Sequence, residues 1–175
     1  VVVENQQVQA ENILNQYEVL KNQLNPHMLF NSLNTLRSLV REDQDKAQEY
    51  IQELSRVLRY TLQGNDSKSV TLRDEMEFVS AYIFLLKMRF EDNLSFDIRI
   101  DKQYDDHRLP PMAVQMLIEN AVKHNEISDR RPLSIRVYTE GEELVVTNPV
   151  QPKLTATAGT GVGLANLAKR YHLLY

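Results

Sequence analysis

The sequence predicts an α+β protein: a helical hairpin followed by a sandwich of helices on one face of a mixed sheet. Two observations predict this. Apolar residues recur at steps of three and four up to about residue 61, and short alternating runs bounded by turn residues follow from about residue 96. We place the domain boundary between residues 65 and 66, giving a helical domain 1–65 and a second domain 66–175.

The hairpin is predicted from residues 4–40 and 47–61, joined by a polar turn at 41–45. Pro26 lies inside the first helix, where a proline costs roughly 3 kcal/mol, so we expect a kink that opens His27 to a partner. One set of residues marks the inner stripe of the second helix: Ala47, Ile51, Leu54, Leu58 and Thr61. One hairpin cannot fully bury its apolar faces, so we expect two copies to pair as a four-helix bundle in a homodimer. A hairpin packed on its own second half is the less favoured alternative.

The second domain begins after residues 64–67, which are typical of a helix break. Thr71 is predicted to cap a third helix that ends near Arg89. The side chains expected to face inward from this helix are Phe78, Tyr82, Leu85 and Leu86. Pro110 and Pro111 are expected to open a fourth helix.

Three strands are predicted to form the sheet. They are residues 96–100, 133–139 and 144–148, with a turn at 140–142 between the last two. A loop rich in Thr, Ala and Gly follows at 151–159, and a final helix is expected to begin near Gly163.

Composition excludes several classes of function. The net charge of −4 gives no basic surface for nucleic acid, and the chain has no cysteine for disulfides or thiolate-bound metal. No apolar run approaches the roughly 20 residues that span a bilayer, so we expect any membrane attachment to lie in segments missing from this chain.

The first chemically informative motif is Q-L-N-P-H-M-L-F-N-S-L-N at residues 23–34. His27, Asn31 and Asn34 recur at helical spacing, and three asparagines flank the histidine although asparagine is a poor helix former and a poor core residue. A buried core histidine is the plain structural alternative, but this cluster favours a functional one.

This motif resembles the phosphoacceptor region of LytS-type (YehU-like) sensor histidine kinases, with Met28 in place of the usual aromatic residue. The resemblance implies that His27 accepts phosphate and that Asn31 serves the reverse, phosphatase reaction. An asparagine that only satisfies a backbone carbonyl freed by Pro26 is an equal alternative for Asn31. Asn31, Asn34 or an acid from the other domain are candidates for orienting His27, because Met28 lacks an acidic group.

Two further motifs lie in the second domain. In Q-M-L-I-E-N-A-V-K-H-N at residues 115–125, one helix side is expected to carry Met116, Asn120, Lys123 and His124. An amide oxygen suits Mg²⁺, and a lysine suits phosphate. In G-T-G-V-G-L at residues 159–164, the glycines allow the backbone to approach phosphates.

In this order the two motifs resemble the Bergerat ATP-binding fold of histidine kinases, gyrase, Hsp90 and MutL. The resemblance implies ATP and Mg²⁺ as cofactors, with Asn120 as the magnesium ligand and residues 151–159 as a mobile ATP lid. It places Lys123, His124, Gly159, Gly161, Gly163 and Leu164 around the phosphates.

The sequence departs from this family at the adenine aspartate, whose place is taken by Asn148. The family fold usually continues with further strands, so we expect the domain to be truncated at its C-terminus. A gyrase-class ATPase would carry a catalytic glutamate where Met116 stands. The alternatives are such an ATPase or a degenerate kinase acting as a dimeric scaffold.

The resemblance implies a sensor histidine kinase of a two-component system, with a response-regulator receiver domain as its partner. It also implies that the chain is the cytoplasmic portion of a bacterial inner-membrane protein.

Overall fold

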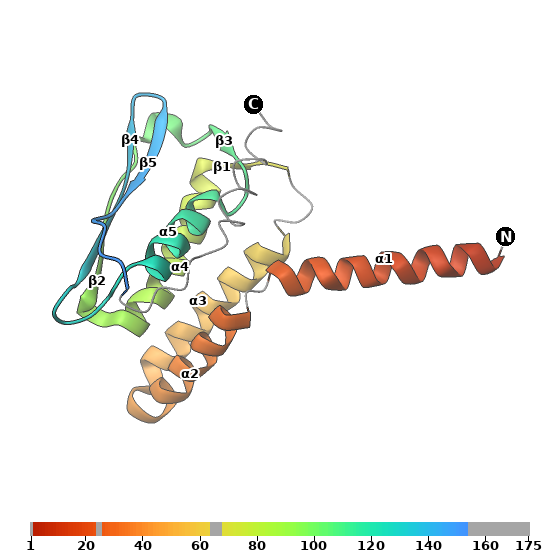
Figure 1. Cartoon of the computed structure of the whole chain (residues 1–175), viewed down its shortest axis with the longest axis horizontal. Helices are drawn as coiled ribbons and strands as arrows, with labels where there is room; N and C mark the ends of the chain where they lie inside the picture. The colour runs from red at the N-terminus through yellow and green to blue at the C-terminus, as the bar shows by residue number, and fades with distance from the viewer. Residues whose placement is uncertain (1, 24–25, 64–67, 154–175) are drawn as a thin grey trace. The chain divides into compact units, whose positions relative to one another are not determined.

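A computed structural model describes residues 2–23, 26–63 and 68–153, with only the backbone for residues 2, 3, 15–23, 26 and 27. The chain divides into two compact units, residues 1–63 and 64–175. The described residues of the first unit form helices and no strand, and the second unit combines helices with a mixed sheet, as Figure 1 shows. The α+β class predicted from the sequence is therefore confirmed.

The first unit contains three helices: α1 (Val2–Gln23), α2 (Pro26–Glu42) and α3 (Gln44–Gln63). The structure describes α1 up to Gln23 and α2 from Pro26, and residues 24 and 25 between them lie outside the described residues. The expected kink at Pro26 therefore stays a prediction. His27 follows Pro26 at the N-terminal end of the described part of α2.

The turn between α2 and α3 is reduced to Asp43. Its backbone N–H donates to Leu39 O at 2.8 Å, and its side chain accepts the N–H of Lys46 at 3.2 Å. A side-chain oxygen that takes an amide near the start of a helix satisfies a donor that has no partner inside the helix. The two helices can therefore follow each other with no longer loop.

The buried stripe of α3 differs in part from the predicted one. Ala47, Leu54 and Thr61 are buried as expected, but Ile51 is 46% exposed and Leu58 is half-buried. Tyr50 and Val57, each 1% exposed, take their place. Exposed apolar side chains remain on both helices of the hairpin: Phe30, Leu33, Val40, Ile51 and Leu62.

The second unit begins with a short strand, β1 (Val70–Thr71), and α4 (Leu72–Phe90). Thr71 caps α4 as predicted, since its hydroxyl accepts the N–H of Asp74 at 3.2 Å. The four side chains expected to face inward from α4 are all buried. β1 pairs antiparallel with β3 (Arg108–Leu109), which places Val70 opposite Leu109.

The main sheet has the order β2–β4–β5, from β2 (Leu94–Arg99), β4 (Leu133–Glu140) and β5 (Glu143–Thr147). β2 runs parallel to β4 and pairs Leu94 with Leu133, while β4 and β5 form an antiparallel hairpin. The hairpin turns at Gly141, whose φ of +58° suits glycine. Two short 3₁₀ turns, η1 (Glu91–Asn93) and η2 (Lys102–Tyr104), flank β2.

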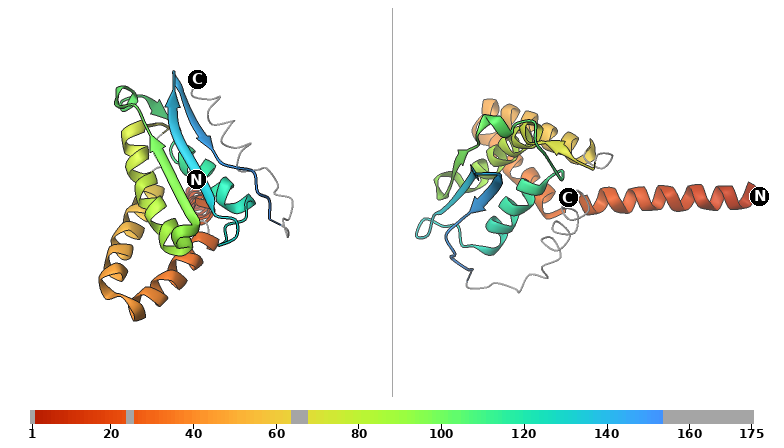
Figure 2. Two further views of the ribbon diagram at one scale, coloured as in Figure 1. Left: turned by 90° about the vertical axis from the view of Figure 1, so that its left-hand side faces the viewer. Right: turned by 90° about the horizontal axis from the view of Figure 1, so that it is seen from above.

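The core of this unit lies between one face of the sheet and two helices, α4 and α5 (Ala113–His124) (Figure 2). Alternation along β4 buries Leu133, Ile135 and Val137 to 1% exposure or less, while Ser134 and Arg136 face outward. The sheet is therefore covered on one face by helices, as the sequence predicted. None of the described helices is both long enough and apolar enough to span a bilayer.

Candidate active site

The helix α5 carries most of the candidate nucleotide-binding residues. It does not begin at the two prolines, which was the expectation, but at Ala113, after Met112 in a left-handed conformation with φ of 64°. Pro110 and Pro111 are instead fully buried ahead of the helix. The helix start is therefore determined by a tertiary contact.

That contact comes from Glu75 on α4, which is 0% exposed. Its two carboxylate oxygens accept the backbone N–H groups of Met112 at 3.0 Å and Val114 at 3.3 Å. The first N–H groups of a helix have no partner within it, and a negative charge there is also favoured by the helix dipole. Glu75 thus fixes the N-terminal end of α5 to α4.

The face of α5 that points into the core carries Val114, Ile118 and Ala121. The four residues predicted to share the other side are not buried: Lys123 is exposed, and Met116, Asn120 and His124 are half-buried. Within the part of the chain that the structure describes, no side chain bonds the Asn120 amide, the Lys123 amine or the His124 ring. Among the described residues, these three polar groups lie together on the side of α5 that faces away from the core.

The C-terminal end of α5 is tied to the chain that leaves β5. Asn125 donates its amide to Ala121 O at 2.8 Å and accepts the backbone N–H of Gln151 at 2.9 Å. Asn148 lies only three residues before Gln151, directly after β5. The structure therefore brings the segment of Asn148 to the same end of α5 that carries Asn120, Lys123 and His124.

Asn148 is half-buried, and its side-chain nitrogen donates to Pro149 O at 2.8 Å. This bond commits one amide N–H and leaves the amide oxygen as an acceptor. An amino group is the complementary donor for such an oxygen. The geometry suits the adenine contact that the resemblance implies for this position.

The predicted ATP lid at residues 151–159 is corrected at its first residue. Gln151 is 8% exposed and held by several hydrogen bonds, because its side chain meets the backbone carbonyls of the loop before β4. It is an anchor and not part of a mobile lid. Pro152 and Lys153 are described and exposed, whereas lid residues 154–159, the glycines at 159, 161 and 163, Leu164 and the expected final helix lie outside the described residues.

His27 and Asn31 lie in the first two turns of α2. The structure describes the backbone of His27 alone. Asn31 is half-buried, and its backbone carbonyl accepts the hydroxyl of Thr35 at 2.9 Å. His27 belongs to the first unit and the candidate nucleotide residues belong to the second.

A buried polar cluster that the sequence did not reveal connects α4 to α5. Gln115 donates to the carboxylate of Glu119 at 3.0 Å, and both lie near Tyr82 of α4. Burial raises the pKa of the Tyr82 hydroxyl well above its ordinary value, and the charge of Glu119 raises it further. Tyr82 therefore stays protonated between α4 and α5, with Gln115 as its hydrogen-bond partner.

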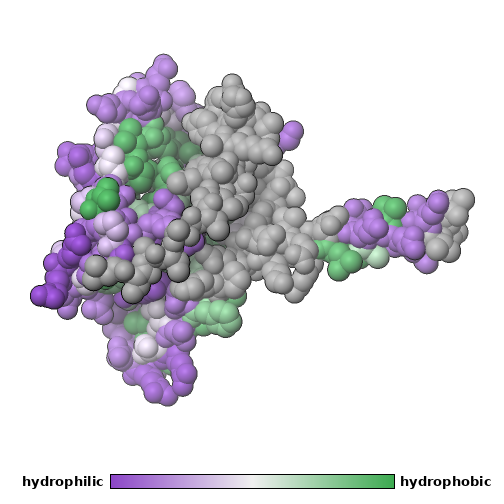
Figure 3. All heavy atoms as spheres, in the orientation of Figure 1, coloured by the Kyte–Doolittle hydropathy of each residue, from purple (hydrophilic) through white to green (hydrophobic). Residues whose placement is uncertain are grey.

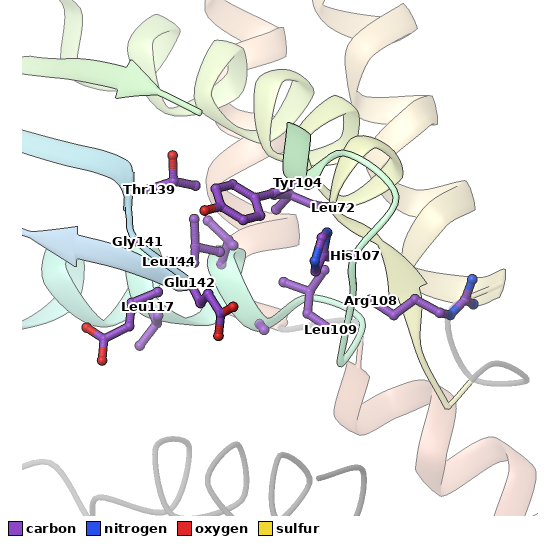
Figure 4. A pocket seen from close by; sticks show the side chains of 13 residues that line it. Leu72, Tyr104, His107, Arg108, Leu109, Leu117, Thr139, Gly141, Glu142 and Leu144 are labelled. Carbon is purple, nitrogen blue, oxygen red and sulfur yellow. The ribbon is translucent and has the colours of Figure 1, made fainter. Parts of the chain in front are cut away.

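A cavity of about 570 Å³ lies at the other end of α5. Its wall includes Ala113, Val114 and Leu117 from the first half of α5, together with the β4–β5 turn. Hydrophobic side chains gather on this part of the second unit, with hydrophilic ones around them (Figure 3). Tyr104 extends toward Leu144 of the hairpin, whereas Arg108 points away (Figure 4). The cavity is thus separate from the candidate nucleotide residues, which lie in the second half of the helix.

No group of three or more acidic or histidine side chains among the described residues is arranged to hold a metal ion by itself. The donor set at Asn120 suits a different arrangement, in which one amide oxygen joins phosphate and water oxygens around Mg²⁺. Such a site fits a magnesium ion that arrives with a nucleotide.

Comparisons with known proteins agree with these motifs. The sequence model of the family described as Histidine kinase matches residues 15–94. The chain is 34% identical to the Sensor protein LytS of Streptococcus agalactiae over 90% of its own length and 30% of that protein. It is 35% identical to the Sensor histidine kinase BtsS of Escherichia coli over 85% of its length and 28% of that protein. The chain spans about 30% of the length of the LytS relative it matches.

Proposed function

This chain belongs to the LytS-type sensor histidine kinases, and we propose that it transfers the γ-phosphoryl group of ATP to His27. A nitrogen of the neutral imidazole attacks the γ-phosphorus in line. The N–P bond forms as the bond to the β,γ-bridging oxygen breaks, and ADP leaves. The phosphoryl group then passes to an aspartate of a response-regulator receiver domain.

The observation that carries this proposal is the set of available polar side chains at one end of α5. Asn120 would hold Mg²⁺ together with nucleotide oxygens, and Lys123 and His124 would contact phosphates. Asn148 would accept a hydrogen bond from the adenine amino group through its amide oxygen, because its amide nitrogen already donates to Pro149 O. Bound Mg²⁺ supplies charge neutralisation on the phosphates. The domain predicted at residues 66–175, which makes up nearly all of the second unit, would accordingly be the Bergerat-type ATP-binding domain.

The helical domain predicted at residues 1–65, which includes the first unit, would be the dimerisation and phosphoacceptor domain. Support comes from its exposed apolar side chains: Phe30 is 68% exposed, Val40 52% and Leu33 49%. They recur at steps of three and seven and so share one face of α2. Large apolar side chains exposed on one side of a helix are typical of an interface. A second copy of the hairpin would cover this face and complete a four-helix bundle.

We place this activity on the cytoplasmic side of a bacterial inner membrane, where ATP and the partner receiver domain are found. The relatives, which bear the names of sensor proteins, do not favour the scaffold or the gyrase-class ATPase.

The direct test is incubation with γ-labelled ATP and Mg²⁺. Histidine phosphorylation predicts label that is lost in acid and retained in alkali, as a phosphoramidate requires. Label that survives acid would indicate a different acceptor, and release of free phosphate with no labelled protein would indicate an ATPase.

A further inference from the structure

We propose that Gln151 is a positioning residue of the nucleotide site, which fixes the segment of Asn148 against the C-terminal end of α5. This inference rests on the proposed function, because it takes this end of α5 as the ATP site. Gln151 itself contacts neither the phosphates nor the base in this proposal.

The side chain of Gln151 gathers three backbone carbonyls. Its amide nitrogen lies 2.7 Å from Glu126 O, 3.0 Å from Arg131 O and 3.3 Å from Pro132 O, so that its two N–H groups are shared among three acceptors. Glu126 follows α5 closely, and Pro132 immediately precedes β4. One amide therefore closes both ends of the loop that connects the nucleotide helix to the central strand.

The backbone of Gln151 is bound equally closely to the same region. Its N–H donates to the side chain of Asn125 at 2.9 Å, and its carbonyl accepts the N–H of Glu126 at 2.8 Å. Pro152 then forms an isolated antiparallel bridge with Asn125. Gln151 thus joins the ends of α5 and of the loop to the chain that leaves β5.

Gln151 is also the only buried side chain in residues 148–153, a stretch that the structure describes completely. Its neighbour Val150 is 84% exposed. Pro149 and Pro152 fix their own φ angles and favour extended conformations at Asn148 and Gln151, which precede them. Thr147 of β5, paired with Arg136, holds this segment on one side of Asn148, and the anchor at Gln151 holds it on the other. Because the intervening backbone is stiff, the position of the Asn148 amide depends on both.

The expected consequence is specific to nucleotide affinity. If the amide of Gln151 is removed, the segment loses its side-chain anchor beyond Asn148, and the amide oxygen of Asn148 is held less firmly in place. ATP then binds more weakly, while the attack of His27 on bound ATP proceeds unchanged. A residue with a purely structural role would instead lower turnover and stability together.

The test is Gln151→Met, which keeps the length of the side chain and removes the amide. The matched control is Gln103→Met, because Gln103 is exposed and its amide bonds only Asp101 in its own turn, at 2.8 Å. Affinity for Mg·ATP is measured by titration, and KM and kcat are measured by autophosphorylation. We expect the KM of Gln151→Met to rise about tenfold or more with little change in kcat, and the control to match the unaltered protein.

If the unaltered protein binds Mg·ATP and Gln151→Met has an unchanged KM, this inference is overturned while the proposed function is not. A parallel loss of kcat and thermal stability with no change in KM would overturn it in the same way. Absence of ATP binding by the unaltered protein would overturn the proposed function as well. If Gln151→Met does not fold, Gln151→Asn keeps a shorter amide and is expected to raise KM to a smaller extent; a folded Gln151→Asn with unchanged KM would also contradict the proposal.

Discussion

A carboxylate oxygen of Glu75 accepts the backbone N–H of Met112 at 3.0 Å, although the two residues lie 37 positions apart. The contact holds Met112 in its left-handed conformation and gives α5 an anionic cap. It links the first turn of α4 to the helix whose other end carries the candidate nucleotide residues.

Glu75→Ala should therefore lower the free energy of unfolding of the second unit substantially. Two buried N–H groups lose a charged acceptor, which corresponds to a loss of about 3 kcal/mol. Urea denaturation followed by circular dichroism measures it. Glu77→Ala is the control, because Glu77 is exposed on the same helix. Equal stability of the two variants would contradict the role assigned to Glu75.

His27→Gln should abolish phosphorylation while the protein still binds Mg·ATP. The glutamine lacks the imidazole nitrogen that forms the N–P bond. Labelling with γ-labelled ATP and a separate nucleotide titration measure the two properties. His107→Gln serves as the control, since it removes an exposed imidazole from the second unit. Normal labelling of His27→Gln would exclude His27 as the acceptor.

Asn120→Ala should remove the magnesium dependence of ATP binding. The variant loses the amide oxygen proposed to coordinate the ion, and affinity should approach that measured with EDTA. Titration with and without Mg²⁺ provides the comparison, and Asn93→Ala, in a half-buried position outside α5, is the control. Intact magnesium dependence in Asn120→Ala would place the ion elsewhere.

Asn31→Ala should separate two roles for this residue. A phosphatase role predicts that His27 is phosphorylated normally and that the partner is dephosphorylated more than tenfold more slowly. A tenfold lower rate corresponds to an activation free energy that is higher by about 1.4 kcal/mol. A role in satisfying the backbone predicts lower thermal stability and equal loss of both activities.

Asn34→Ala is a closely matched control for Asn31→Ala. The carbonyls of Asn34 and Asn31 each accept a hydroxyl one turn later, from Ser38 at 3.3 Å and Thr35 at 2.9 Å. Dephosphorylation at the normal rate by Asn31→Ala would rule out the phosphatase role.

Phe30→Ser combined with Leu33→Ser should weaken the homodimer. Both side chains are exposed on α2, and burial of two large apolar side chains contributes about 3–6 kcal/mol. Sedimentation velocity over a concentration series measures the shift toward monomer. The control is Val150→Ser, which removes an exposed apolar side chain from the other unit. If the double change leaves dimerisation unaffected, the interface lies elsewhere.

The sequence predicts those features that depend on neighbouring residues. Thr71 caps α4 through an amide three residues away, and Gly141 turns a hairpin whose strands adjoin it. The alternation of β4 reveals its inward face without further information.

The features that the sequence does not predict depend on distant residues. In the sequence, Glu75 is only one charged residue on an amphipathic helix. Its role follows from its contacts with Met112 and Val114, which the sequence alone does not reveal. Gln151 stands in a polar loop in sequence, yet it is buried because the carbonyls of Arg131 and Pro132 surround its amide. Ile51 belongs to the apolar stripe by spacing but is exposed, because α3 buries only one side within its own unit.

The parallel pairing of β2 with β4 has a consequence for folding. Antiparallel neighbours close through a tight turn, but Leu94 meets Leu133 only after the chain has crossed from one end of the sheet to the other. That crossing contains α5, so the β2–β4 pair requires closure of a long connection with its own helix, whereas the β4–β5 hairpin is local. Long-range closure of this kind slows folding. A chain that misplaces the helix that carries Asn120 should therefore weaken the β2–β4 pair and displace the nucleotide residues together.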